Sequence, residues 1–214
     1  MTITNSLRFA LGVSLLAVLA SVITSVEGQQ RVESQSANFL GQLEPPQIGR
    51  PSFVSPHASP IAVNSNLVFV ANTPADTVDV IDSQTREVIA RVDVGVDPVS
   101  IARRPDGKEV WVSNHISDSV SVIDTDESSP TFLNVIATVQ EFDTARKATS
   151  FDEPMGIAFA SNKKAYVALS SDNQIAVIDV ASREVTKRLT ITAQDPREIV
   201  VRDGKLYVLS LIHI

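Results

Sequence analysis

The chain has 214 residues, a formal net charge of −7, 43% hydrophobic residues and no cysteine. Without cysteine, these residues form no disulfide, no thiolate zinc site and no covalent haem attachment through a CxxCH motif. The acidic balance, with no basic patch, argues against a nucleic-acid-binding protein. Aromatic residues make up only 5% of the chain, and Val and Ile dominate the apolar residues, which favours strands over helices.

The N-terminus differs from the rest of the sequence. Arg8 precedes an apolar run, Phe9 to Ile23, which falls short of the ~20 apolar residues of a transmembrane helix. Residues 1–28 are therefore predicted to be a secretory signal peptide, cleaved after Gly28, with an uncleaved anchor as the alternative. We expect a periplasmic or extracellular protein with no transmembrane segment after cleavage. Residues 29–54, rich in Gln, Ser and Pro, are predicted to be a linker or N-terminal arm.

A sequence unit recurs in the rest of the chain. In each complete copy an aromatic residue precedes a closing aspartate by 13 positions, and a further copy begins with its aromatic residue at Tyr207. The complete copies are VFVANTPADTVDVID (68–82), VWVSNHISDSVSVID (110–124) and AYVALSSDNQIAVID (165–179). Each holds two β-branched runs around a polar turn, which is the pattern of a β-hairpin.

The surroundings of the unit repeat as well. A proline and a short apolar strand lie upstream of every copy, and another strand lies downstream of each complete copy. The prolines are Pro60, Pro98, Pro154 and Pro196, and the downstream strands start at Glu87, Asn134 and Glu184. Four short antiparallel strands in about 42 residues are typical of a β-propeller blade.

The repeat predicts an all-β fold, with residues 55–214 forming roughly three and a third four-stranded antiparallel blades. The expected blades are 55–95, 96–150, 151–192 and the incomplete 193–214. A closed propeller has about four to eight blades. We therefore expect the chain to be a fragment, with the missing C-terminal blades completing a disc of about seven blades.

The residues of the unit resemble a known family. The apolar strand after the proline, PDGKEVWVSN (105–114), SVSVID (119–124) and the closing VDVG (92–95) are similar to the YVTN repeat of bacterial and archaeal β-propellers. The resemblance covers most of the chain after the linker. It implies a secreted, surface-layer-like propeller or a propeller attached to a redox domain, because this repeat serves many proteins.

Residues that recur at fixed positions have structural explanations. The closing aspartates are expected to accept hydrogen bonds from backbone N–H groups of the next turn. The aromatic residues are expected to pack between blades rather than to bind a cofactor. The aspartates are Asp82, Asp124 and Asp179, and the aromatic residues are Phe69, Trp111, Tyr166 and Tyr207.

The second unit departs from the others by its length. About five extra residues lie within 125–132 and about nine within 140–154. In a propeller, connections between blades share one face with the turns between second and third strands. The 141–153 insertion and the His115 turn are therefore expected on the same face, where loops on a rigid scaffold carry binding sites. A solvated surface loop explains the insertion equally simply and is the favoured alternative.

This face supplies the candidate binding residues, for a protein, a cell-envelope component or a small ligand at the channel mouth. Arginines on innermost strands are placed to meet an anion in the channel. His115 aligns with the turn residues Thr73 and Ser170 and is expected at the surface. The candidate set is Asn72, Arg103, Asn114, His115, Arg146, Lys147 and Arg197.

The sequence contains no metal-ligand spacing, nucleophile motif or phosphate loop, so neither catalytic residues nor a cofactor are predicted. Three functions remain open. The first is a secreted, non-catalytic propeller used for binding or scaffolding. The second is the propeller part of a larger periplasmic, haem-bearing redox protein, and the third is a lactonase-like hydrolase. We favour the first.

Overall fold

The computed structural model describes residues 57–145 and 147–211. These residues form strands and turns, with one 3-10 turn, η1 (Thr73–Ala75). The predicted signal peptide and the whole predicted linker, as well as Arg146 and residues 212–214, lie outside the described residues. Within the described part, no helix has the length and apolar character needed to cross a bilayer.

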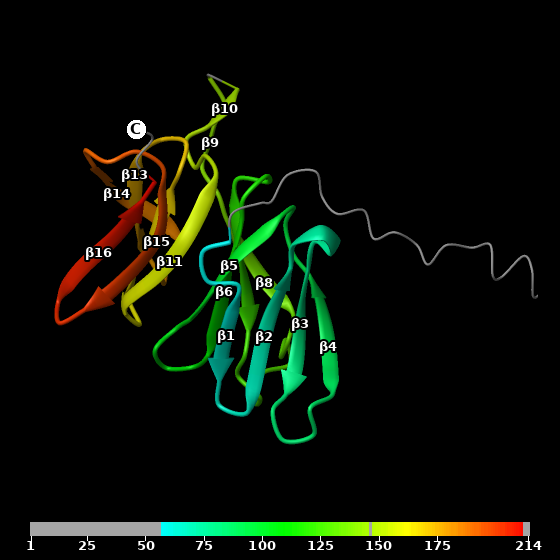
Figure 1. Cartoon of the computed structure of the whole chain (residues 1–214). Helices are drawn as coiled ribbons and strands as arrows, with labels where there is room; N and C mark the ends of the chain where they lie inside the picture. Colours follow the sequence, from blue (N-terminus) through cyan, green and yellow to red (C-terminus); the bar gives the residue numbers. More distant parts are fainter. Residues whose placement is uncertain (1–56, 146, 212–214) are drawn as a thin grey trace, which may run out of the picture. The chain divides into compact units, whose positions relative to one another are not determined.

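Three four-stranded antiparallel sheets follow one another along the chain, each with its strands paired in sequence order (Figure 1). We name them blades 1, 2 and 3. Blade 1 holds β1 (Ile61–Asn64), β2 (Leu67–Asn72), β3 (Thr77–Asp82) and β4 (Val88–Asp93). Blade 2 holds β5 (Pro98–Arg103), β6 (Glu109–Asn114), β7 (Ser119–Asp124) and β8 (Val135–Val139). Blade 3 holds β11 (Pro154–Ser161), β12 (Lys164–Leu169), β13 (Gln174–Asp179) and β14 (Glu184–Thr190).

Two smaller sheets complete the described fold. Blade 4 consists of the antiparallel pair β15 (Pro196–Arg202) and β16 (Lys205–Ser210). Between blades 2 and 3, β9 (Phe142–Asp143) and β10 (Ala148–Thr149) form a short hairpin, named here the insertion hairpin. The predicted all-β fold of four-stranded antiparallel blades is confirmed.

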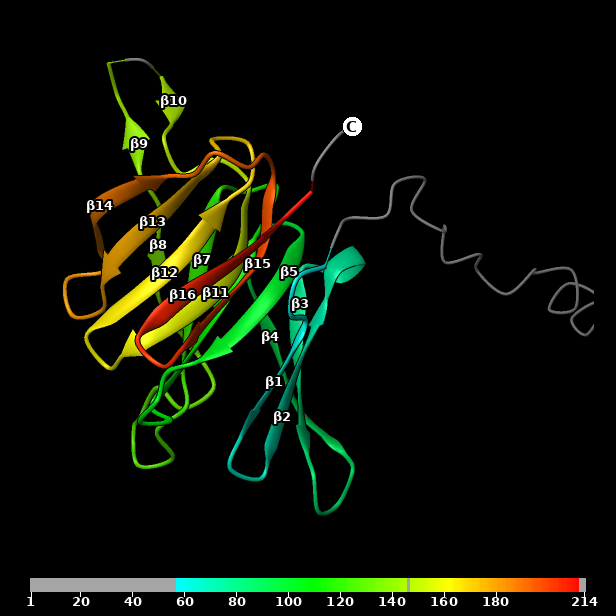
Figure 2. The same ribbon diagram turned by 60° about the vertical axis from the view of Figure 1, so that its left-hand side comes forward.

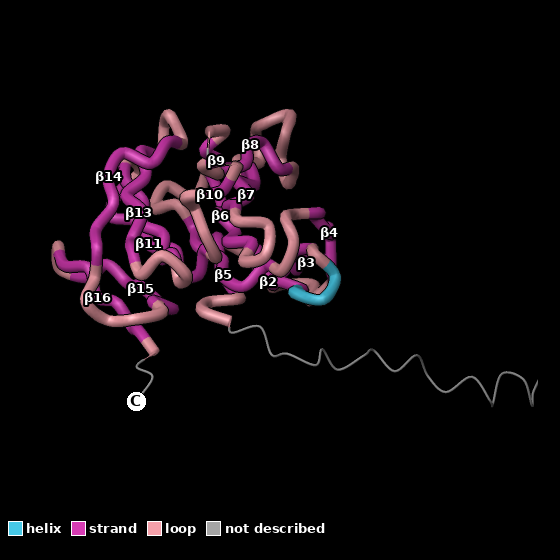
Figure 3. Tube along the Cα trace, turned by 90° about the horizontal axis from the view of Figure 1, so that it is seen from above, coloured by secondary structure: helices cyan, strands magenta, loops and turns pink. Residues whose placement is uncertain are grey.

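Consecutive blades pack face to face (Figure 3), and their innermost strands are neighbours, since β5 contacts β1 and β11, and β11 contacts β15. One apolar cluster fills each interface between consecutive blades. All six residues of β7 are buried, because blade 1 covers one face of this strand and blade 3 covers the other. This double burial explains why Ile123 is apolar although it lies on the same face of the strand as Ser119 and Ser121.

Three of the four repeated aromatic residues pack in these interfaces. Phe69 and Trp111 are fully buried, and the Trp111 ring meets Phe159 of blade 3 edge to face, with centroids 5.2 Å apart and planes at 75°. Tyr166 packs, partly buried, against the cluster between blades 3 and 4. Tyr207 of blade 4 is 51% exposed, so the packing prediction is confirmed for the first three residues and not for the fourth.

The closing aspartates cap the turns that follow them. Asp82 Oδ1 accepts the N–H groups of Gln84 and Thr85 at 2.7 and 2.9 Å. Asp179 Oδ1 accepts those of Ala181 and Ser182 at 3.0 and 2.9 Å. Hydrogen bonds from backbone N–H groups lower the pKa of both carboxyls. The largest contribution comes from Thr85 for Asp82 and from Ser182 for Asp179. Asp124 accepts the N–H of Asp126 at 3.0 Å, so the predicted turn role is confirmed.

Replacing Phe69 tests the face-to-face packing. Phe69→Ala leaves a cavity in the interface between blades 1 and 2, and the free energy of unfolding is expected to fall by about 3–5 kcal/mol. Phe142→Ala is the matched control because that ring is 60% exposed, and its effect should stay within about 0.5 kcal/mol. Urea unfolding followed by circular dichroism measures both. Equal losses for the two variants would contradict the assigned packing.

Candidate functional site

A repeated hydrogen bond ties each blade to the connection that leads into the next one. A side chain in the turn between the second and third strands accepts the N–H of the residue before the next blade's proline. The pairs, with their N···O distances, are Asp76 with Asp97 (2.8 Å), Asp118 with Glu153 (3.0 Å) and Asn173 with Asp195 (2.7 Å). All six residues have φ between 49° and 64°. Among residues other than glycine, Asp and Asn tolerate this left-handed region best, which explains why they occupy the turn positions 76, 118 and 173.

These bonds place three turns and three connections on one face, which we name the insertion face. It comprises the turns at 73–76, 115–118 and 170–173 and the connections 94–97, 140–153 and 191–195. The predicted grouping of the His115 turn with the 141–153 insertion is confirmed, because Asp118 in that turn bonds directly to Glu153.

The two candidate asparagines close the ends of their hairpins. Asn114 is fully buried, and its Nδ2 donates to Ser119 Oγ at 3.1 Å and to Ser121 Oγ at 3.0 Å. Asn72 Nδ2 donates to Thr77 Oγ1 at 3.3 Å in the same place of blade 1. Both amides bridge the second and third strands and thereby stabilise the hairpin end.

The candidate histidine serves the blade connection through its backbone. The His115 N–H donates to the carbonyl of Asp97 at 2.9 Å. The equivalent Ser170 N–H donates to Glu153 O at 3.1 Å. The His115 side chain is partly buried rather than fully at the surface as expected, and its Nδ1 is enclosed. Among the residues that the structure describes, no three His, Cys, Asp or Glu side chains form a metal-binding group.

The positively charged candidate residues on this face differ in their partners. Arg197, next to Pro196 on the insertion face, is neutralised by Asp195, with Nη2 and Oδ2 2.6 Å apart. Its Nη1 lies 3.8 Å from Met155 Sδ. Lys147 lines a pocket beside the insertion hairpin. Arg146 lies outside the described residues.

The insertion hairpin projects beyond the ends of the neighbouring strands in both side views (Figures 1 and 2). Its base is anchored by the fully buried Phe151 and by the ion pair between Glu141 and Arg188 of β14. Between the hairpin and the β6–β7 turn lies a pocket of about 210 Å³. The pocket is lined by Ser117, Asp118, Gln140, Glu141, Phe142, Lys147, Ala148 and Thr149.

Asp118 and Glu141 line this pocket together with Lys147, and further carboxylates affect Asp118. Burial, followed by the charges of Asp152 and Glu153, raises the pKa of Asp118 although it accepts a backbone N–H. Burial also raises the pKa of Asp172, against the opposing effect of Arg188. In both cases burial disfavours the ionised form, and the neighbouring carboxylates add to this effect. The sequence did not predict the hairpin, because two-residue strands leave no periodicity, and it did not predict the partial burial of Asp118.

Arg103 lies at the opposite end of blade 2 from His115, so its predicted place on the same face is wrong. Pro98 pairs with Asn114 at one end of the β5–β6 hairpin, and Arg103 pairs with Val110 towards the other end. Six strand residues separate the two ends by about 17 Å at ~3.3 Å per residue. Arg197, by contrast, directly follows its proline and stays on the insertion face.

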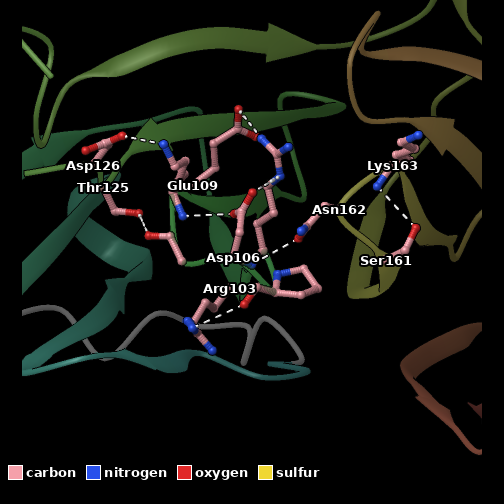
Figure 4. A network of polar contacts seen from close by, with 12 residues as sticks. Arg103, Asp106, Glu109, Thr125, Asp126, Ser161, Asn162 and Lys163 are labelled. Atoms are coloured by element: carbon pink, nitrogen blue, oxygen red, sulfur yellow. Dashed lines mark hydrogen bonds and ion pairs between the residues drawn. The ribbon is translucent and has the colours of Figure 1, made fainter. Parts of the chain in front are cut away.

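A polar network occupies the end of blade 2 where Arg103 lies (Figure 4). Glu109, which is 8% exposed, accepts the Trp111 indole N–H at 2.8 Å and pairs with Arg104 at 3.2 Å and Arg183 at 3.5 Å. The Asp106 N–H donates to Asn162 of blade 3 at 2.9 Å. These contacts join the ends of blades 2 and 3, and nothing in the repeat pattern predicted them.

No protein-family profile and no curated protein sequence matches this chain. Its fold does match solved structures. The Kuenenia stuttgartiensis hydrazine synthase structure aligns with a TM-score of 0.59 and 30% identity, over 73% of this chain and 41% of that chain. The β-propeller domain of Myceliophteria thermophila Cps50 (Swd1) aligns at 0.57 and 13% identity, over 72% of this chain and 47% of that one.

A third match is the dihydro-heme d1 dehydrogenase NirN in complex with DHE, with a TM-score of 0.52 and 20% identity, over 73% of this chain and 32% of that one. These likenesses establish the propeller fold. The chain spans less than half the length of each of the three matched structures.

The loop after β7 gives a test of the polar network. Asp126 accepts the Ser128 hydroxyl at 2.6 Å and its N–H at 3.1 Å, and pairs with Lys108 at 2.9 Å, which lowers the pKa of Asp126 from 3.8 to about 2. Ser128→Ala removes the leading contribution, so the pKa of Asp126 should rise towards 3.8. A carboxyl ¹³C NMR titration measures it.

The sign of the pH effect follows from the lowered pKa. The ionised carboxylate stabilises the folded state above pH 3.8, and that contribution is lost as the pH falls through about 2. The stability difference between wild type and Ser128→Ala should therefore shrink with acid. Thr131→Ala is the control: Thr131 donates to Asp124, so this substitution should leave the pKa of Asp126 at about 2. An unchanged pKa in Ser128→Ala contradicts the assignment.

Proposed function

We propose that this protein is an exported β-propeller of the YVTN type that acts as a binding and scaffold module in the periplasm or outside the cell. The insertion face receives a protein partner or a cell-envelope component, and the insertion hairpin is the element that contacts it. The observation that carries the proposal is this hairpin, which projects beyond the strand ends of blades 2 and 3, whose facing sheets are buried against each other.

The construction of the hairpin supports recognition. Its base is fixed by Phe151 and by the Glu141–Arg188 pair, so the projecting part is held at a defined position. Phe142 presents 60% of its surface to solvent beside a pocket of about 210 Å³. An exposed aromatic ring next to a pocket on a rigid base is the arrangement of an interface anchor.

The charges around the pocket indicate the complementary chemistry of the partner. Asp118 and Asp172 have raised pKa values, first because of burial and further because of neighbouring carboxylates. A positively charged group of the partner, placed among these carboxylates, relieves that repulsion. Complementary charge of this kind sets specificity and association rate more than affinity.

Site-specific cross-linking in cells of the organism that encodes the protein tests the proposal. One full-length variant carries a photo-crosslinking side chain at position 142, and a matched one carries it at position 88. Phe142 and Val88 are 60% and 55% exposed, but Val88 lies on the outer strand β4 of blade 1. A discrete adduct is expected from position 142 only. The absence of an adduct at position 142, or the same adducts from both positions, would contradict the proposal.

A second candidate is the propeller part of a larger periplasmic redox protein. The 30% identity to the hydrazine synthase structure over 73% of this chain favours it, as does the fold likeness to the NirN dehydrogenase. The same cross-linking separates the candidates. A haem-bearing chain or segment joined to position 142 favours the redox protein, whereas a haem-free envelope protein favours the scaffold.

A further inference from the structure

A second cavity, of about 480 Å³, opens at the end of the blades opposite the insertion face, between blades 1 and 2. Three segments enclose it: the β1–β2 turn, the end of β5 with the β5–β6 turn, and the loop after β7. The lining residues are Asn64, Ser65, Leu67, Arg103, Asp106, Gly107, Lys108 and 125–128. The volume lies within the usual range of small-molecule sites.

Neutral groups hold the Arg103 guanidinium in this cavity. Its Nε donates to Asn64 Oδ1 at 2.8 Å. Its Nη2 donates to the Pro105 carbonyl at 3.3 Å, and Figure 4 shows Arg103 beside Asp106 at this end of blade 2. Asn64 is only 6% exposed, and its Nδ2 donates to Gly107 O at 2.8 Å. A buried amide therefore orients the guanidinium and the adjoining turn together.

Gly107 shapes the turn around this arginine. Its φ is +74°, in the left-handed region that favours glycine. A Cβ at this position would lie 2.8 Å from Asn64 Oδ1 and 3.2 Å from Arg103 Nη2. The glycine thus permits both the turn and the close approach of the guanidinium.

The other charges of the cavity are largely balanced within the protein. Lys108 pairs with Asp126 at 2.9 Å, and Asp106 pairs with Arg104 at 3.3 Å. Arg103 has no carboxylate partner among the residues that the structure describes. Most of the described arginines do have one, namely Arg91, Arg104, Arg183, Arg188, Arg197 and Arg202.

A guanidinium carries five N–H donors in a planar fork. Two bonds of Arg103 go to neutral acceptors, so the remaining donors and the full positive charge are left for another group. A planar fork of this kind matches the two oxygens of a carboxylate or phosphate, and charge-assisted bonds of this type are strong. Of the lining acids, Glu127 is exposed and lies outside the ion pairs described above.

We propose that this cavity binds a small oxyanion ligand, a carboxylate or a phosphate, through the Arg103 guanidinium. Asn64 and Gly107 are positioning residues that hold the fork open towards the cavity. The site is independent of the insertion face, so the module has two binding ends, one for a macromolecular partner and one for a small anion.

The test is an NMR titration of the full-length protein with ¹⁵N-labelled arginine side chains. Inorganic phosphate, sulfate and acetate are added in turn at constant ionic strength, and the Arg103 Nε–H signal is followed. A saturable shift is expected with phosphate, with acetate or with both, and the relative midpoints identify the preferred oxyanion. A shift that stays linear with every probe overturns the proposal.

Three variants make the test specific. Arg103→Lys keeps the charge but loses the fork, and Arg103→Gln loses both. Because a charged hydrogen-bonded pair is worth roughly 1.5–3 kcal/mol, binding should weaken about tenfold or more, judged by the backbone signals of Gly107 and Lys108. Arg202→Gln removes the same charge from an exposed position outside the cavity and should leave the midpoint unchanged. Equal midpoints in wild type and Arg103→Gln overturn the proposal.

The variants are expected to remain folded, because the Arg103 side chain is exposed and outside the apolar clusters. Trp111 fluorescence, which reports on the interface between blades 2 and 3, checks the fold of each variant. If no oxyanion binds, the cross-linking result at position 142 is unaffected, so the two experiments test the two proposals independently.

Discussion

The burial of each blade against the next is the interaction on which the rest of the structure depends. A four-stranded meander has two apolar faces here, and neither is covered within its own sheet. In blade 2 both faces are covered, by blades 1 and 3, and every residue of β7 is buried. In this blade the ends of the strands and the outer strand β8 stay accessible, and both pockets described above lie at strand ends.

The two ends are built from different chemistry. At the insertion face, side chains of Asp76, Asp118 and Asn173 accept backbone N–H groups of the connections between blades. One of these connections contains the insertion hairpin. At the other end, side-chain ion pairs join the turns, with Glu109 and Asp126 as the main acceptors. Raised carboxyl pKa values mark the first end, and the lowered pKa of Asp126 marks the second. At the first end Asp118 is partly buried among other carboxylates, while at the second Arg103 has no carboxylate partner among the described residues.

The repeat predicted the blades well, because strand, turn and closing aspartate return at a fixed spacing. The roles of Asp82 and Asp179 and the burial of Phe69 and Trp111 follow from that spacing alone. The site was predicted only in part. Arg103 and Arg197 were grouped because both lie on innermost strands, but strand length separates them: Arg197 follows its proline directly, and Arg103 closes a six-residue strand. The insertion hairpin and the Glu109 network depend on contacts between units, which a repeat pattern does not encode.

The central claim is that a cooperative framework of packed blades carries an insertion hairpin that is energetically separate from it. Native-state hydrogen exchange of the full-length protein measures this most directly, because it gives an opening free energy for each amide. Amides of β6 and β7 are predicted to exchange only through global unfolding, so their opening free energies should fall as denaturant is added. Amides of β9 and β10 are predicted to exchange through local opening, with no dependence on denaturant. Hairpin amides that exchange together with those of β7 would contradict the account.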